Sequence, residues 1–225
     1  MILNKTLHHG GKYQYRIHKK KLEHLCGNGF ENLKKYIVQS FEKIPDEYFF
    51  KGPRSSILKF SVLKEKLSRI EHEVAILARM GLESNYYQDA HSNVQMFMLS
   101  YDEKTIAMEV PIWLHPQEFD EYKKIFKEEQ PLTGHIDILR IEDDKIWVWD
   151  FKPNAHREKY ATTQTYFYAY MLSKRSGIPI ENFMCGYFDD KNTYIFDPSK
   201  IKIQEIIKNP LLIPQNSNLC AHTTP

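Results

Sequence analysis

The sequence predicts an α/β or α+β fold, in which helices pack against a central mixed β-sheet and the N-terminal region is helical. Two patterns lead to this prediction. In the first third of the chain, apolar residues recur at the 3.6-residue period of an amphipathic helix. From about residue 104 onward, apolar runs alternate with turn residues, which indicates strands separated by shorter helical segments. With 225 residues, 42% of them hydrophobic, the chain can bury one substantial core.

The first part of the chain is predicted to be mainly helical. Residues 31–44 have helical character up to Pro45, and a loop containing Gly and Pro follows. A long helix is expected over residues 56–80, with a serine as its N-cap and Gly81 after its last turn. Its apolar stripe has helical spacing and consists of Phe60, Leu63, Leu67, Ile70, Val74 and Leu77.

The second part is predicted to alternate strands with helices. Apolar runs indicate strands over residues 105–114, 132–141, 145–152, 183–189 and 193–197. Helices are expected between and after them, over residues 116–128, 157–175 and 198–208. We therefore divide the chain into a basic, helical N-terminal region (1–55), an α/β core (56–208) and a loosely held C-terminal tail (209–225).

Charge is unevenly distributed along the chain. The net charge is +2, yet residues 1–35 contain eight Lys or Arg and two Glu, and the remaining residues carry a net negative charge. A basic segment of this kind is suited to contact with a polyanion such as nucleic acid. The alternative is a solvated, basic leader with no partner.

Other features exclude several classes of protein. Cys26, Cys185 and Cys220 are far apart, which gives neither a disulfide framework nor a zinc or iron–sulfur motif. No run of 18 or more apolar residues is present, and the first residues lack the apolar segment of a secretory signal. We therefore expect a soluble, cytoplasmic protein without membrane contact.

The segment GHIDILRIEDDKIWVWDFK, residues 134–152, contains the strongest candidate for chemistry. Alternate residues of a strand share a face, so Asp150 and Lys152 should point to the same side. If Asp143-Asp144 forms a two-residue hairpin turn, Asp137 lies directly opposite Asp150. Cross-strand partners have Cβ atoms roughly 5 Å apart, so two carboxylates and an ammonium group should meet on one small patch.

Such a patch is suited to a divalent metal ion. Two close carboxylates repel unless a cation lies between them, and Mg²⁺ or Mn²⁺ prefers oxygen ligands. The carbonyl group of Phe151 could be a third ligand besides Asp137 and Asp150. Lys152, with His135 expected opposite it, could activate water or stabilise charge on a phosphate oxygen. The alternative is a surface ion-pair cluster of little energetic value.

These residues resemble a known family. The strand GHID, the hairpin, the strand DFK and a helix carrying Gln164 and Tyr168 are similar to the RecB-type branch of the PD-(D/E)XK nucleases. The resemblance implies a restriction-endonuclease-like fold over the core. It also implies that Gln164 and Tyr168, which are four residues apart on one helix face, look onto the site. Ordinary packing of an aromatic-rich helix is the alternative for this pair.

The family also has an upstream histidine that binds the metal. The resemblance assigns this role to His72, in the segment IEHEV, with Glu73 as the reserve candidate. Glu109, in the strand AMEVPIW, corresponds to a family glutamate for which we expect a supporting role. Pro153 departs from the family pattern because many relatives have Thr after the lysine. The four cysteines of the iron–sulfur relatives and the Walker A loop of helicases are absent from the sequence.

The function predicted from this resemblance is metal-dependent hydrolysis of DNA. The cofactor would be Mg²⁺ or Mn²⁺, held by His72, Asp137, Asp150 and the carbonyl of Phe151. An exonuclease or an end-processing enzyme of repair, recombination or mobile elements fits this branch. Two alternatives stay open, namely a nuclease fold that binds nucleic acid without cutting it and a nuclease that acts on RNA.

Overall fold

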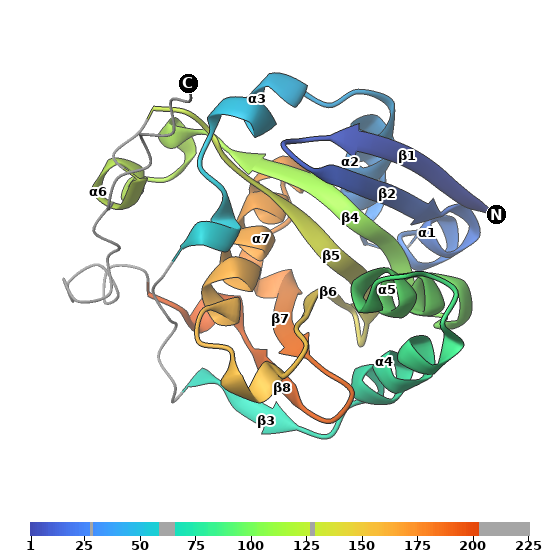
Figure 1. The fold of residues 1–225 in the computed structure, drawn as a ribbon. Coiled ribbons are helices and arrows are strands. Elements are labelled where there is room, and N and C mark those ends of the chain that lie inside the picture. The colour runs from blue at the N-terminus through green and yellow to red at the C-terminus, as the bar shows by residue number, and fades with distance from the viewer. Residues whose placement is uncertain (28, 59–65, 127–128, 203–225) are drawn as a thin grey trace, which may run out of the picture.

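The computed structural model describes residues 1–27, 29–58, 66–126 and 129–202. Within them the chain forms an eight-stranded mixed sheet with flanking helices and the strand order β1-β2-β4-β5-β6-β7-β8-β3 (Figure 1). Neighbouring strands are antiparallel except β6 and β7, which run parallel. This arrangement confirms the predicted α/β class and is consistent with a restriction-endonuclease-like fold.

The strands in chain order are β1 Ile2–His8, β2 Lys12–His18, β3 Ser68–Ile70, β4 Thr105–Leu114, β5 Leu132–Glu142, β6 Lys145–Phe151, β7 Phe183–Phe188 and β8 Thr193–Phe196. The helices are α1 Lys19–Leu25, α2 Glu31–Glu42, α3 Asp46–Lys51, α4 Glu73–Ser84, α5 Ala90–Tyr101, α6 Tyr122–Phe126 and α7 Ala161–Ser176. The helix α7 connects the parallel strands β6 and β7, as expected for a crossover connection.

The β5–β6 hairpin forms as the sequence predicts. Asp143 and Asp144 both have positive φ, 49° and 53°, as a two-residue type I′ turn requires. Pairing runs from Glu142↔Lys145 to Ile138↔Trp149, which is the register predicted from the turn. Extending that register by one residue brings Asp137 and Asp150 opposite each other at the open end of the hairpin.

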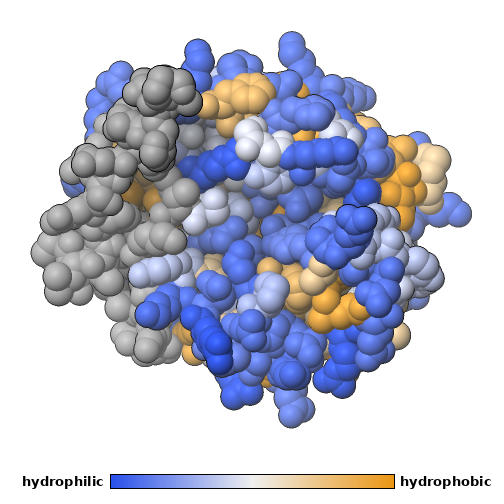
Figure 2. All heavy atoms as spheres, in the orientation of Figure 1, coloured by the Kyte–Doolittle hydropathy of each residue, from blue (hydrophilic) through white to orange (hydrophobic). Residues whose placement is uncertain are grey.

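Two hydrophobic cores lie on the two faces of the sheet. The larger contains side chains from α2 and α7 together with alternate residues of β5 and β6, such as Leu139 and Val148. The smaller contains side chains from α4 and α5 packed on Ile138, Trp149 and Phe188. Residues of β5 and β6 alternate between the two cores, so both strands are covered on both sides. The surface in the view of Figure 2 is mostly hydrophilic, with scattered hydrophobic patches.

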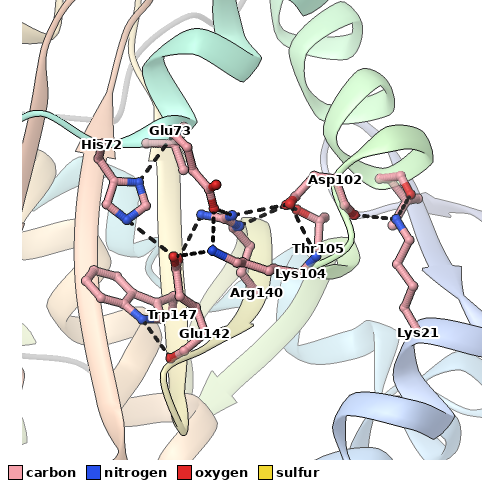
Figure 3. Close-up of polar contacts among 11 residues, drawn as sticks. Lys21, His72, Glu73, Asp102, Lys104, Thr105, Arg140, Glu142 and Trp147 are labelled. Atoms are coloured by element: carbon pink, nitrogen blue, oxygen red, sulfur yellow. Dashed lines mark hydrogen bonds and ion pairs between the residues drawn. The ribbon is translucent and has the colours of Figure 1, made fainter.

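A buried arginine ties α4 and α5 to the sheet (Figure 3). Arg140 on β5 is fully buried, and its guanidinium binds carboxylates of Asp102, Glu142 and Glu73. The Arg140 Nε to Asp102 Oδ2 distance is 2.9 Å, and the Nη1 to Glu142 Oε2 distance is 3.0 Å. Lys104 bridges Glu73 and Glu142 at 2.7 and 2.6 Å. Because a buried charge is stable only when paired, the network fixes where both helices begin or end.

The structure differs from the sequence prediction before residue 104. The N-terminal region that was expected to be helical contains helices only from Lys19 onward. Residues 2–18 instead form the β1–β2 hairpin, which joins the sheet through β4. The helix α3 lies in the expected loop, and α5 was not predicted at all. Of the helix expected over 116–128, the structure has a short 3-10 turn at Pro116–Glu118 and α6.

Of the long helix expected over residues 56–80, only the part from Glu73 onward is α-helical in the described residues. Residues 68–70 form β3, and α4 begins only after His72, whose Nδ1 accepts a hydrogen bond from the Val74 N–H. Residues 59–65 lie outside the described residues, as does most of the helix expected over 198–208. Gly81 does not end α4. A Cβ there would lie 2.8 Å from the Val94 Cα, so this glycine allows α4 and α5 to pack closely, and the helix ends at Asn85 in the left-handed region.

Candidate active site

A pocket of about 410 Å³ opens beside the start of β5. Its walls come from β2, α5, β4, β5 and α7, together with the segment that follows α3. Charged and polar side chains dominate the lining, and Asp137, His91, Glu109, Gln164 and Tyr168 are all part of it. Three of the residues predicted from sequence, Asp137, Gln164 and Tyr168, therefore meet in one concave site.

Asp137, His91 and Glu109 form a compact group of ligand atoms. The Nε2 atom of His91, in the first turn of α5, lies 3.0 Å from Asp137 Oδ2. Gln95, one turn further along α5, donates to Glu109 Oε1 at 2.7 Å and to the Asp137 carbonyl at 3.3 Å. One ligand atom from each of the three residues lies within 4.8 Å of the others. The helix α5 thus supplies both a ligand and its support.

Glu109 has an unusual backbone for a strand residue. Its φ angle is 53°, in the left-handed region, although Met108 and Val110 on either side pair regularly with β5. A non-glycine residue in this conformation costs about 1–3 kcal/mol, which the surrounding sheet must offset. The distortion accompanies a Glu109 carboxylate that reaches the pocket beside Asp137.

Asp150 and Lys152 form the second half of the site. Asp150 is fully buried, and its Oδ2 lies 2.7 Å from the Lys152 Nζ. The backbone N–H of Phe151 donates to Asp137 Oδ2 at 3.3 Å, which holds the two strand ends together. Among the described residues, neither Asp150 oxygen has a hydrogen-bond partner of good geometry. A buried carboxylate left this way is costly and indicates a missing partner.

Charges in the site are strongly coupled. Burial opposes ionisation of Asp137, but its contact with His91 outweighs burial and lowers the pKa of Asp137 to about 2. The same contact raises the pKa of His91 to about 9, again against burial. Burial, with the charge of Asp137 added, raises the pKa of Glu109 to about 7 and that of Asp150 well above its usual range. Burial opposes protonation of Lys152, but Asp150 outweighs it and raises the pKa of Lys152.

These residues fit a divalent metal ion. Glu109 and Asp137 gather beside the His91 imidazole, and the buried Asp150 carboxylate has no hydrogen-bond partner of good geometry, although its Oδ2 lies 2.7 Å from the Lys152 Nζ. A hard cation would satisfy these oxygens and remove the repulsion that raises the carboxylate pKa values. His91, Glu109, Asp137 and Asp150 are the residues that would hold it, and the Phe151 carbonyl would be a further oxygen ligand.

The Gln164–Tyr168 pair lies on α7 against the start of β5. Gln164 Nε2 donates to the Tyr168 hydroxyl at 2.7 Å, and both side chains line the pocket. A Cβ at Gly134 would lie 2.4 Å from Tyr168 Cε1, so the glycine before Asp137 makes room for the ring. The sequence GHID therefore needs its glycine for packing and its aspartate for the site.

The structure does not bring His72 to this pocket. Its Nε2 lies 3.6 Å from Glu142 Oε2, and its ring packs near Trp147 and Trp149 (Figure 3). Glu142 is five residues beyond Asp137 on β5, a separation of about 17 Å along the strand. Glu73 also belongs to the Arg140 network at that end of the hairpin. His135, expected to face Lys152, lines the pocket but bonds to His9.

Sequence reasoning missed His91 and gave Glu109 only a supporting role. A signal for His91 was present as Asp89, two residues before it, which caps α5 by accepting a hydrogen bond from the Ser92 N–H at 2.7 Å. An acidic cap followed by His at the second helical position and Gln95 one turn later would have indicated a polar helix start facing a site.

An acidic strand pair with a lysine, beside a pocket that Asp137 lines on a mixed sheet, is the arrangement expected of a metal-dependent phosphodiesterase. The sequence profile of the PD-(D/E)XK nuclease superfamily matches residues 37–216 of the chain. The chain belongs to this superfamily, whose members are typically metal-dependent phosphodiesterases. No curated protein and no solved structure matches the chain. Within the described residues, no helix is both long and apolar enough to cross a membrane.

Proposed function

We propose that the protein is a Mg²⁺- or Mn²⁺-dependent nuclease that hydrolyses DNA, of the RecB-type branch and without an iron–sulfur cluster. An exonuclease or an end-processing enzyme of repair, recombination or mobile elements fits that branch. The observation that carries the proposal is the set Asp137, Asp150 and Lys152 at the open end of one hairpin, beside His91 and a pocket. A catalytically inactive relative would not need this set intact.

Each residue has a distinct role in the proposed reaction. His91, Glu109, Asp137 and Asp150 hold the metal ion, with the Phe151 carbonyl as a further ligand. The bound ion would polarise the phosphate and lower the pKa of a coordinated water. Lys152, held by Asp150 at 2.7 Å, donates hydrogen bonds to the attacking water or to a phosphate oxygen and stabilises negative charge there.

Gln164 and Tyr168 position the substrate or the metal-binding acids in this proposal. Their mutual hydrogen bond fixes both side chains on one wall of the pocket. Both residues line the same pocket as Asp137. Both groups can contact a nucleotide without taking part in bond cleavage.

The test compares Asp150→Asn and Lys152→Ala with the unchanged protein on end-labelled linear DNA and on circular DNA, each single- and double-stranded, with and without Mn²⁺. We expect both variants to lose at least about a hundredfold in rate, as for removal of one transition-state stabiliser. Undiminished metal-dependent cleavage by both variants would reject the site. The pattern of labelled products gives polarity and endo- or exonucleolytic mode.

Two alternative functions predict different results for the same protein. A module that binds nucleic acid without cutting it would show no cleavage, and calorimetry would detect no Mn²⁺ uptake. A ribonuclease would cleave labelled RNA in preference to DNA in a competition assay. The complete acid–lysine set favours an active enzyme over a binding module.

A further inference from the structure

We propose that Arg54, Tyr13 and Lys12 form a binding subsite for a phosphate group of the substrate, beside the acidic site. All three line the same pocket as Asp137 and His91. They come from the N-terminal hairpin and from the segment after α3, whereas the acids come from β4, β5 and β6. The proposal rests on the proposed function, because it names the part of a nucleic-acid substrate that this wall would hold.

Arg54 is held in place from several directions. Its Nη1 donates to the Tyr13 hydroxyl at 2.7 Å, and its Nη2 donates to the His9 carbonyl. Its backbone forms a bridge with Thr133 at the start of β5. Gly10 has a φ of +67°, and a Cβ there would lie 2.6 Å from the Arg54 Nη2, so the hairpin turn is shaped around this side chain. A guanidinium fixed in this way is preorganised for a ligand.

The positive charge of this wall has no ion-pair partner in the part of the chain that the structure describes. Among the described residues, neither Arg54 nor Lys12 forms an ion pair with a carboxylate, although Arg54 is only half exposed. Arg140 shows the opposite case, since three carboxylates surround it inside the protein. An anchored but unpaired guanidinium in a pocket is suited to an anion, and phosphate oxygens match its planar set of donors.

Tyr13 supplies a further donor from a rigid position. Because its hydroxyl oxygen accepts from Arg54, its own proton is free to donate to a ligand. Its ring stacks on His135, with 3.8 Å between centroids and 10° between planes. A chain of hydrogen bonds supports His135, from its Nε2 to His9 Nδ1 at 2.9 Å and from His9 Nε2 to Asp46 Oδ1 at 2.8 Å. The carboxylate of Asp46 accepts, so His9 accepts in turn from the Nε2–H of His135.

The wall lies close enough to the acids for one substrate strand to reach both. His135 stands two residues before Asp137, about 7 Å along β5. A strand whose scissile phosphate lies at the acids would therefore bring another of its phosphate groups to Arg54. The group held there is either an internal phosphodiester or a terminal phosphomonoester, which have the same oxygen acceptors and differ in charge.

The test measures the binding constant K for fluorescent oligonucleotides at several salt concentrations. Ca²⁺ is present in place of Mg²⁺ or Mn²⁺. Arg54→Gln should weaken binding about tenfold or more and reduce the slope of log K against log salt by about 0.7–0.9, the loss of one phosphate contact. Tyr13→Phe keeps the ring on His135 and should weaken binding less. The matched control is Arg79→Gln, since Arg79 is exposed on α4 and bonds to the Asp190 carbonyl outside this pocket.

A set of four substrates identifies the phosphate group that Arg54 binds. The set contains oligonucleotides with a 5′-phosphate, with a 3′-phosphate and with no terminal phosphate, and a closed circle. An Arg54 effect confined to one phosphorylated end assigns a terminal phosphomonoester, and an equal effect on all substrates assigns an internal phosphodiester. Unchanged affinity and salt slope in a folded Arg54→Gln protein, or an equal loss in Arg79→Gln, would overturn the subsite. Failure of the proposed function would give a distinct result. The unchanged protein would bind the oligonucleotides more tightly than Arg54→Gln but would not cleave them in Mn²⁺.

Discussion

Replacing Gly134 by alanine tests whether the site depends on close packing between α7 and β5. The added Cβ would lie 2.4 Å from Tyr168 Cε1 and 2.7 Å from Ser55 Oγ, whereas ordinary contacts begin at about 3.4 Å. Either the tyrosine ring or the strand must move by roughly an ångström. Overpacking of this kind costs about 1–3 kcal/mol. Alanine also restricts the unfolded chain, which offsets about 0.4–1 kcal/mol.

The free energy of unfolding should therefore fall by about 1–2 kcal/mol, a difference that urea denaturation can measure. Displacement of Tyr168 should also break its 2.7 Å bond with Gln164 and lower the cleavage rate. The same substitution in a Tyr168→Ala protein separates the two contacts, because the ring is then absent and the stability loss should be smaller, with only the contact to Ser55 Oγ remaining. Gly27→Ala is the control, since the nearest atom to its Cβ is the Glu23 carbonyl oxygen at 3.3 Å. Equal stability losses with and without the Tyr168 ring would refute the reasoning.

Three further predictions follow from the site and the buried network. His91→Ala should lower Mn²⁺ affinity at least about tenfold in calorimetry, whereas His72→Ala should leave it unchanged, and the reverse result would restore His72 as the ligand. Without metal, Glu109 has a pKa of about 7 in the folded protein against an ordinary value of 4.5, so the folded state binds more protons between these values. Stability should consequently fall as the pH rises from about 4.5 to about 7, and thermal melts of Glu109→Gln should lack this component. Arg140→Met should lower the free energy of unfolding by about 3–5 kcal/mol, because it leaves buried carboxylates without their ion-pair partner. A urea midpoint equal to that of the unchanged protein would contradict this prediction.

The β5–β6 hairpin could be predicted in detail because its determinants are local. Two aspartates suited to positive φ fix the turn, and the turn fixes which residues face each other. The predicted meeting of Asp137 with the end of β6 needed no information from elsewhere in the chain. The pair Gln164 and Tyr168 could be predicted for the same reason, since helical spacing alone puts both residues on one face of the helix.

His91, the ligand proposed in place of His72, could not be predicted because its position depends on tertiary packing. The helix α5 packs against both α4 and β4, and its buried residues include Asn93, Val94 and Gln95 in succession. A helix buried on several sides has no single apolar stripe, so hydrophobic periodicity did not indicate α5, although its acidic N-cap was visible in the sequence. The helix expected over residues 56–80 instead crossed the boundary between β3 and α4, and the family resemblance assigned the upstream histidine to His72 within it.

The N-terminal hairpin was not predicted, although β2 alternates between polar and apolar residues. In KYQYRIH the side chains of Tyr15 and Ile17 are buried and Arg16 lies between them, but the segment was interpreted by its basic charge rather than by this period of two. The strands form because β4 offers them an edge, with Arg16↔Met108 and Ile17↔Ala107 as partners. That edge is a long-range partner which local sequence cannot reveal.

The superfamily profile begins at residue 37, after both strands of this hairpin. A shortened protein that starts at the profile boundary would lose Lys12 and Tyr13 from the pocket wall and uncover the backbone of β4 along its outer side. An uncovered strand of that length pairs readily with another molecule, so the shortened protein should self-associate in solution. The smallest unit that folds on its own should therefore be larger than the region that sequence comparison delimits, and trimming for crystallisation or fusion should leave the first eighteen residues in place.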